Sequence, residues 1–277
     1  EYNRSASPAI MKYVVMGSVV ATLLSFNAWA QVTLVKDGAP HAVVVTADMP
    51  SDTARYAANE LVWHIEQAAG VQLDIVTESQ APEAPHTRVY VGMTEAARRN
   101  GIDPERLPRE TYVLRSVGND LFIVGQEDDG DPLREENPHI GTLFGVYAFL
   151  ESVLDVRWLW PGELGVYIPR TDTVEVWAVN AMEAPALRFR GLYWGRMRAI
   201  AEGRAALDGE DARLGFDPDV AKQYADALRV FLRRHRMGGM DAKPPTGHSF
   251  VGWWHRHGET HPEWFLMRRD GGRGRLD

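Results

Sequence analysis

The chain contains no cysteine among its 277 residues, which excludes disulfide bonds, thiolate zinc sites and cysteine nucleophiles. It also lacks a glycine-rich phosphate loop followed by Lys-Ser/Thr, a GxGxxG fingerprint and a GxSxG elbow, so we expect no nucleotide and no other cofactor. Basic residues are few, with 30 Lys and Arg against 38 Asp and Glu and a net charge of −8. This balance argues against nucleic acid or an anionic membrane as the main partner.

No apolar run is long enough to span a bilayer, which takes about 20 residues. The run at 13–26 follows Lys12 and precedes Ala28-Trp29-Ala30, a small-x-small cleavage site. Residues 11–30 are therefore predicted to be a cleavable signal peptide rather than a stable membrane anchor. We expect a secreted or periplasmic protein that begins at Gln31, and residues 1–10 carry no function that we can assign.

Short apolar runs and turn signals predict one α/β unit over residues 31–180, with strands and helices mixed around a sheet. Residues 126–140 predict a solvated acidic loop, because the spacing lacks the regular alternation of oxygen ligands used by calcium loops. The expected strands are 32–36, 42–46, 73–77, 88–92, 111–117, 121–125 and 156–160, and the expected helices are 51–70, 94–100 and 141–154.

A second unit is predicted over residues 185–277, after a linker at Glu183-Ala184-Pro185. Strand-like runs at 187–194 and 250–254 flank a loop and a helix that begins at Asp217-Pro218 and ends near Arg236. This order of elements is typical of the beginning of a (β/α)8 TIM-type barrel. A complete barrel of eight units takes about 250 residues. The predicted fold class is thus α/β, a small mixed-sheet domain followed by the beginning of a barrel.

Several segments in one order resemble a known family. The segment 141–169, "GTLFGVYAFLESVLDVRWLWPGELGVYIP", resembles the end of the N-terminal domain of the α-glucuronidases of glycoside hydrolase family 67 and of a related, largely uncharacterised family. "ARYAANELVWHIEQAAG" and "RVYVGMTEAARRNGI" fit earlier elements of that domain. "RFRGLYWG", "FLRRHRMGG", "GHSF" and "HPEWF" are similar to the barrel start of the uncharacterised family.

The resemblance implies an exported protein that acts on oligosaccharide or polysaccharide, with uronic acids among the sugars considered. Glycoside hydrolysis uses two carboxyl groups, and in such relatives they lie on later barrel strands, so no catalytic residue is assigned in this chain. Two alternatives stay open. One is a non-catalytic carbohydrate-binding protein, and the other is a metal-dependent hydrolase using the pair His255 and His257, completed by His261 or Glu259.

The candidate substrate-binding residues lie after residue 185. Trp194 and Trp254 end apolar runs where aromatic rings can stack on sugars, although core packing is an equal alternative. Arg190 has a guanidinium that can bind two hydroxyls or a carboxylate, or form a buried structural ion pair. His248 and His261 match the family pattern and are candidates for hydroxyl binding, with a structural role as the alternative.

The cluster Arg157, Trp158 and Trp160 precedes Pro161 and raises the same choice between packing and sugar binding. Alternate positions of a strand point to one face, so the two tryptophans are expected to share it. Because burying a tryptophan is strongly favourable, we expect both to pack the interface between the two units, with Arg157 on the opposite face.

Overall fold

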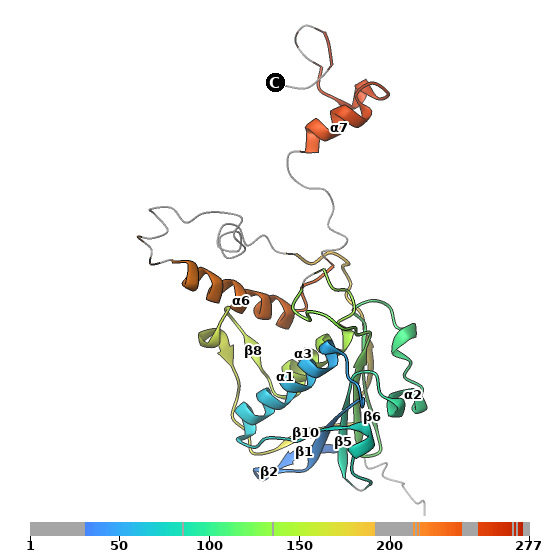
Figure 1. Cartoon of the computed structure of the whole chain (residues 1–277), viewed down its shortest axis with the longest axis vertical. Helices are drawn as coiled ribbons and strands as arrows, with labels where there is room; N and C mark the ends of the chain where they lie inside the picture. Colours follow the sequence, from blue (N-terminus) through green and yellow to red (C-terminus); the bar gives the residue numbers. More distant parts are fainter. Residues whose placement is uncertain are drawn as a thin grey trace, which may run out of the picture.

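The computed structural model describes most of the chain after residue 30 (Figure 1). The predicted signal peptide at 11–30, Trp194 and His248 lie outside the described residues. The described residues are 31–84, 86–134, 136–191, 213, 215, 217–239, 249–267, 269 and 271–273.

A six-stranded mixed sheet forms the centre of the first unit, in the order β11-β6-β7-β5-β3-β4 (Figure 1). Strands β4, β3, β5 and β7 run parallel, whereas β6 pairs antiparallel with both β7 and β11. The predicted α/β class is confirmed. The strands are β3 (Ala42–Thr46), β4 (Ile75–Thr77), β5 (Thr87–Val91), β6 (Tyr112–Val117), β7 (Asp120–Gly125) and β11 (Asn180–Glu183).

A small sheet of β10 (Val174–Val176), β1 (Val32–Lys36) and β2 (Ala39–Pro40) lies beside the large one. The expected turn forms at Asp37 and Gly38, both with positive φ. It joins β1 to the short β2, however, while β3 leaves for the large sheet. The strands predicted at 32–36 and 42–46 are confirmed, but they lie in two different sheets and do not pair with each other.

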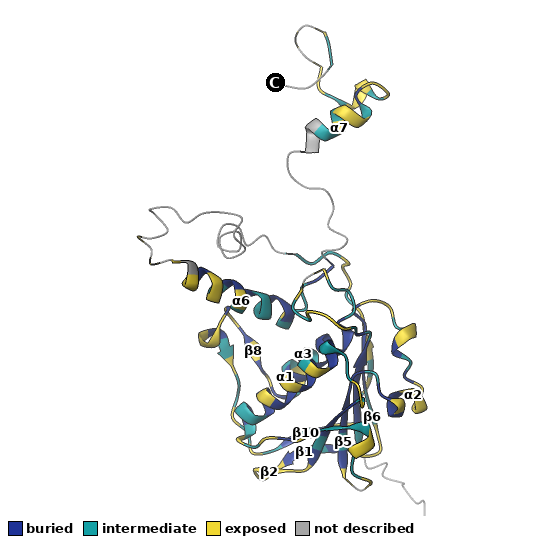
Figure 2. Ribbon diagram, viewed as in Figure 1, coloured by how far each residue is buried: buried dark blue, intermediate teal, exposed yellow. Residues whose placement is uncertain are grey.

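Helices α1 (Asp52–Ala69) and α3 (Gly141–Val153) pack on one face of the large sheet (Figure 2). As predicted, Ser51 begins α1, with its side chain accepting from the Ala54 N–H, and Gly70 ends it in the left-handed conformation. The other face carries a second apolar cluster under α2 (Glu95–Arg99). The short 3₁₀ turns are η1 (Glu78–Gln80), η2 (Pro104–Arg106), η3 (Glu163–Gly165) and η5 (Pro262–Trp264).

A two-stranded hairpin of β8 (Arg157–Trp158) and β9 (Val166–Tyr167) encloses η3. The predicted strand at 156–160 is shorter than expected, because Pro161 and the positive φ of Gly162 turn the chain immediately after it. Trp158 is 3% exposed and Trp160 is 60% exposed. The expectation that both share one buried face was wrong, although Arg157 does lie exposed beside the buried Trp158.

Helix α6 (Pro218–Arg234) begins at its predicted cap, where the Asp217 carboxylate accepts from the Val220 N–H. The other expected elements of the second unit differ. Residues 250–254 belong to helix α7 (Ser249–His257), not to a strand, and Gly258 follows that helix. The predicted strand at 187–194 is described only as far as Gly191. In that part it forms a single isolated bridge, between Arg190 and Gly238.

Within the described part of the chain, no helix combines the length and the apolar character required to cross a membrane.

A tryptophan-lined cleft as the candidate functional site

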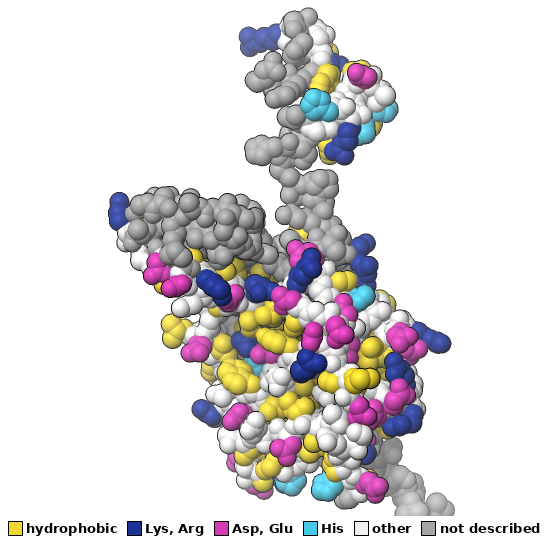
Figure 3. Space-filling model, in the orientation of Figure 1, with side chains coloured by type: hydrophobic (Ala, Val, Ile, Leu, Met, Phe, Trp, Pro, Cys, Tyr) yellow, Lys and Arg dark blue, Asp and Glu magenta, His cyan; other side chains and the backbone are white. Residues whose placement is uncertain are grey.

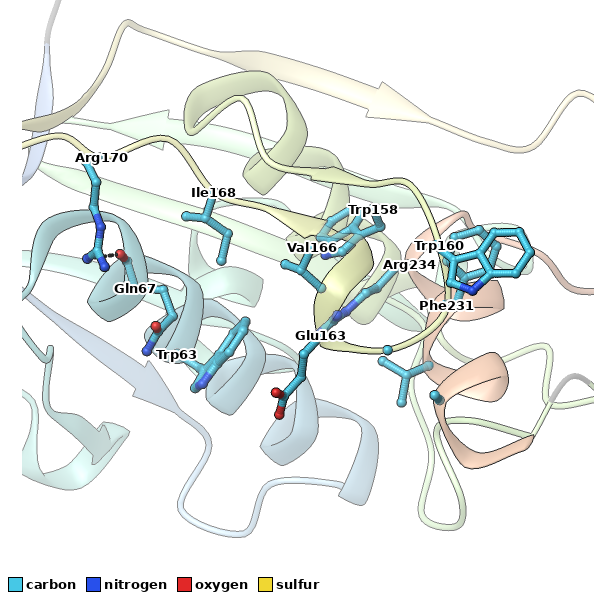
Figure 4. Close-up of a pocket in the computed structure, with 13 residues that line it drawn as sticks. Trp63, Gln67, Trp158, Trp160, Glu163, Val166, Ile168, Arg170, Phe231 and Arg234 are labelled. Atoms are coloured by element: carbon cyan, nitrogen blue, oxygen red, sulfur yellow. Dashed lines mark hydrogen bonds between the residues drawn. The ribbon is translucent and has the colours of Figure 1, made fainter. Parts of the chain in front are cut away.

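A cleft of about 610 Å³ opens between α1, the β8–β9 hairpin and α6 (Figure 4). Its volume falls within the range of small-molecule sites, roughly 300–1,000 Å³. Figure 3 shows hydrophobic side chains gathered on this face below α6, with basic side chains among them. The lining combines aromatic and polar groups: Trp63, Gln67, Trp158, Trp160, Gly162, Glu163, Val166, Ile168, Arg170, Ala227, Val230, Phe231 and Arg234.

Two tryptophans of the cleft are exposed to solvent. Trp63 projects from α1 and is 41% exposed, and Trp160 follows β8 and is 60% exposed. An exposed indole gives up roughly 2–3 kcal/mol of burial, at 25 cal/mol per Å² of apolar surface. Rings left open in a concave site are therefore suited to stacking against the apolar faces of a ligand.

The hairpin that carries Trp160 depends on two glycines. Gly162 has a φ of 91°, a conformation that other residues rarely adopt. A Cβ at Gly165 would lie 2.0 Å from the carbonyl oxygen of Trp160, so any other residue would clash at this position. The Leu159 N–H closes the hairpin by donating to the Gly165 carbonyl at 2.7 Å.

Arg234 and Glu60 form an ion pair next to Trp63 and Trp158, and their side chains are only 12% and 13% exposed. Nε and Nη2 of Arg234 donate to the two carboxylate oxygens of Glu60 at 3.1 and 3.2 Å. The guanidinium also lies over two rings, 5.8 Å from the centroid of Trp63 and 5.6 Å from that of Trp158. Removing one partner of a pair this little exposed is destabilising, because the remaining charge stays largely out of contact with water.

His64 is fully buried between the two tryptophans and is held as the neutral ring. Its Nδ1–H donates to the Glu60 carbonyl at 2.7 Å, and its Nε2 accepts from the indole N–H of Trp158 at 3.3 Å. Burial lowers the pKa of His64 to about 4, opposed by the nearby Glu60 carboxylate. This histidine positions Trp158 and stays uncharged at neutral pH, with its single proton on Nδ1.

The polar groups of the cleft suit hydrogen bonding to hydroxyls. Glu163 extends from η3 and is exposed, and Arg170 donates to the Gln67 carbonyl at 2.5 Å at the end of α1 (Figure 4). Glu163 is the acidic residue among those that line the cleft. Since Glu60 already pairs with Arg234, the described residues that line the cleft do not present the two facing carboxylates that hydrolysis requires.

Arg190, a predicted binding residue, lies elsewhere and uses its donors within the protein. Nη2 pairs with Glu110 at 2.9 Å, Nε donates to the Arg236 carbonyl at 2.9 Å, and Nη1 donates to the Leu187 carbonyl at 2.6 Å. Its side chain is 15% exposed. Arg190 thus forms an ion pair with the buried Glu110, and its role in substrate binding remains a prediction.

Trp254 and His261, also predicted to bind substrate, lie in and after α7. The Trp254 ring meets Phe265 edge-on at 5.0 Å, and a Cβ at Gly258 would lie 2.7 Å from the indole. His261 stacks on Trp264 at 4.0 Å. These rings form a local cluster, so their role in binding remains a prediction.

The histidine pair proposed for a metal, His255 and His257, is not on a strand end. Positions i and i+2 of a helix point to widely different sides, so α7 cannot direct both rings at one ion. Among the residues that the structure describes, no three histidine or acidic side chains gather as a metal site.

The sequence interpretation did not single out Trp63, Glu60 or Arg234. A usable signal was present, because Trp63 lies off the apolar face of α1 that carries Leu61 and Ile65. A large aromatic side chain on the polar side of an amphipathic helix indicates either a covering segment or a ligand. Arg234 is 171 residues away in the sequence, and no local pattern connects it with that helix.

No protein-family model and no curated protein sequence matches the chain. Similar solved structures include a family GH115 4-O-methyl-α-glucuronidase with specificity for decorated arabinogalactans (12% identity, TM-score 0.41, 72% of this chain and 24% of that one). They also include a GH138 enzyme targeting pectin rhamnogalacturonan II (11% identity, TM-score 0.25, 40% and 10%) and CpGH84D (10%, TM-score 0.35, 73% and 33%). The chain thus spans a third or less of their lengths. With TM-scores below 0.5, these likenesses carry no argument about its function.

Proposed function

We propose that the chain is part of an exported carbohydrate-active protein and that the tryptophan-lined cleft binds a saccharide. The observation that supports this proposal is the pair of exposed indoles, Trp63 and Trp160, in one concave site with Glu163, Gln67 and Arg170. Sugars present apolar CH faces and a rim of hydroxyls, which such a mixture of rings and polar groups complements.

The finer proposal is that the parent protein is a glycoside hydrolase similar to α-glucuronidases. It rests on the ordered sequence resemblance. The two carboxyl groups needed for hydrolysis would come from residues other than those of the cleft. The cleft by itself supports binding, so the non-catalytic alternative shares the same site.

Isothermal titration calorimetry with a panel of oligosaccharides, neutral and uronic-acid-containing, tests the proposal. We expect Trp160→Ala and Trp63→Ala to weaken binding of the best ligand tenfold or more, because each removes a stacking surface. Trp177→Ala is the matched control, since Trp177 is 67% exposed and lies outside the cleft. Equal loss in all three variants, or no binding by the unmodified protein, would overturn the proposal.

A further inference from the structure

The last turn of α6 and the residues after it attach this helix to the first unit at several separate points. Arg233 donates to the carbonyl oxygens of Arg134 and Asn137, and the His235 Nε2–H donates to the Trp158 carbonyl at 2.7 Å. Arg236 pairs with Glu151 at 2.5 Å. One basic residue in this run, Arg234, also lines the cleft.

Arg234 contacts the part of the cleft that would stack on a sugar. Its guanidinium lies over Trp63 from α1, while the two carboxylate oxygens of Glu60 fix its plane. A tryptophan on a helix surface otherwise samples several rotamers, and ordering it on binding reduces affinity. A guanidinium over one ring therefore prepares that ring for a ligand.

Helix α6 supplies a whole wall of the cleft, through Ala227, Val230, Phe231 and Arg234. If α6 detaches from the first unit, the cleft loses this wall, and Trp63 loses its contact with Arg234. A ligand that binds only when α6 is docked must therefore stabilise the docked state. The coupling is reciprocal: docking favours ligand binding by the same free energy by which the ligand favours docking.

We propose that Arg234 is a positioning residue for saccharide binding, and that docking of α6 and binding of saccharide stabilise one another. This inference rests on the proposed function of the cleft. Arg234 acts by holding Trp63 and the α6 wall in place.

The test compares Arg234→Lys with Arg229→Lys, using the oligosaccharide that binds the unmodified chain best. Lysine keeps the charge but loses the two-pronged contact with Glu60. Arg229 is the matched control, because it lies on the same helix, pairs with Asp131 and does not line the cleft. We expect at least fivefold weaker binding by R234K and unchanged binding by R229K, both by calorimetry.

Hydrogen exchange, with and without oligosaccharide, supplies a second measurement on the unmodified chain and on R234K. We expect saturating oligosaccharide to slow exchange of the α6 backbone amides at least threefold, and to do so less in R234K. Unchanged α6 exchange, or R234K binding as tightly as the unmodified chain, would refute the coupling. A merely structural arginine would lower stability in R234K and leave the affinity of the folded protein as it was.

Failure of the inference is distinguishable from failure of the proposed function. If the unmodified chain binds no saccharide, the cleft proposal itself fails. If it binds, and W160A weakens binding while α6 exchange and R234K affinity do not change, only the coupling is wrong.

Discussion

Acid should destabilise the protein through His64, the buried histidine behind the cleft. Both ring nitrogens are occupied in the neutral form, one donating to Glu60 and one accepting from Trp158. Protonation would place a second proton opposite the indole N–H, which is itself a donor. It would also add a positive charge near Arg234, in a site without water contact.

The sign and the size of the effect follow from the two pKa values. The pKa of His64 is about 4 in the folded chain, against 6.5 for an ordinary histidine. Between these values the unfolded chain binds more protons than the folded one, so stability is complete above pH 6.5 and falls as the pH drops towards 4. The full loss is about 3 kcal/mol, and roughly 2.5 kcal/mol is lost by pH 4.5.

Urea denaturation at pH 7.0, 6.0, 5.0 and 4.5 measures the effect in the unmodified chain and in His64→Gln. The variant is less stable at pH 7, but its free energy of unfolding should fall about 2.5 kcal/mol less by pH 4.5. Burial raises the pKa of Glu127, which has the opposite effect on acid stability, but this contribution is common to both proteins and cancels. His41→Gln, at an exposed histidine, is the control. Parallel pH profiles for H64Q and the unmodified chain would refute the reasoning.

Three further expectations concern α6, the signal peptide and α7. A chain ending at residue 239 should keep the stability of the first unit. A chain ending at residue 184 should lose at least about 3 kcal/mol of unfolding free energy in urea denaturation, because it lacks the apolar face of α6 and the arginine that pairs with Glu60. Equal stability of the two truncated chains would contradict this expectation. N-terminal sequencing of exported protein should begin at Gln31, and retained signal in a membrane fraction would contradict cleavage. Trp254→Ala should weaken oligosaccharide binding by the full-length protein tenfold or more with little change in Tm if that ring is a platform, and a large fall in Tm at unchanged affinity would identify a packing role.

Local elements whose ends are set by side chains could be predicted from the sequence. Ser51 and Thr94 begin their helices with the expected hydrogen bonds to backbone N–H groups. Gly70 ends α1, and the turn at residues 118–119 joins β6 to β7 as expected. Each of these signals acts within a few residues, so no tertiary information was needed.

Elements that depend on partners far along the chain could not be placed in the same way. Strands β10 and β11 are only three and four residues long, too short for a periodic pattern, and pairing with β1 and β6 makes them strands. The run at 250–254 is too short to separate helix from strand by periodicity alone. The approach of Arg234 to Trp63 needs both helices docked, and the sequence contains no spacing that records it.

The basic end of α6 shows why the candidate site was missed and why it forms where it does. Arginine and histidine at a helix C-terminus are explained locally by the helix dipole, and the sequence interpretation needed nothing more. In the structure these residues contact the first unit: His235 bonds to the Trp158 carbonyl, Arg234 pairs with Glu60, and Arg236 pairs with Glu151. If this helix end only balanced its dipole, the Glu60 carboxylate would lose its ion-pair partner. Arg234 neutralises the little-exposed Glu60 carboxylate, lies over the Trp63 ring and lines the cleft, so the docking of α6 and the formation of the cleft depend on the same contacts.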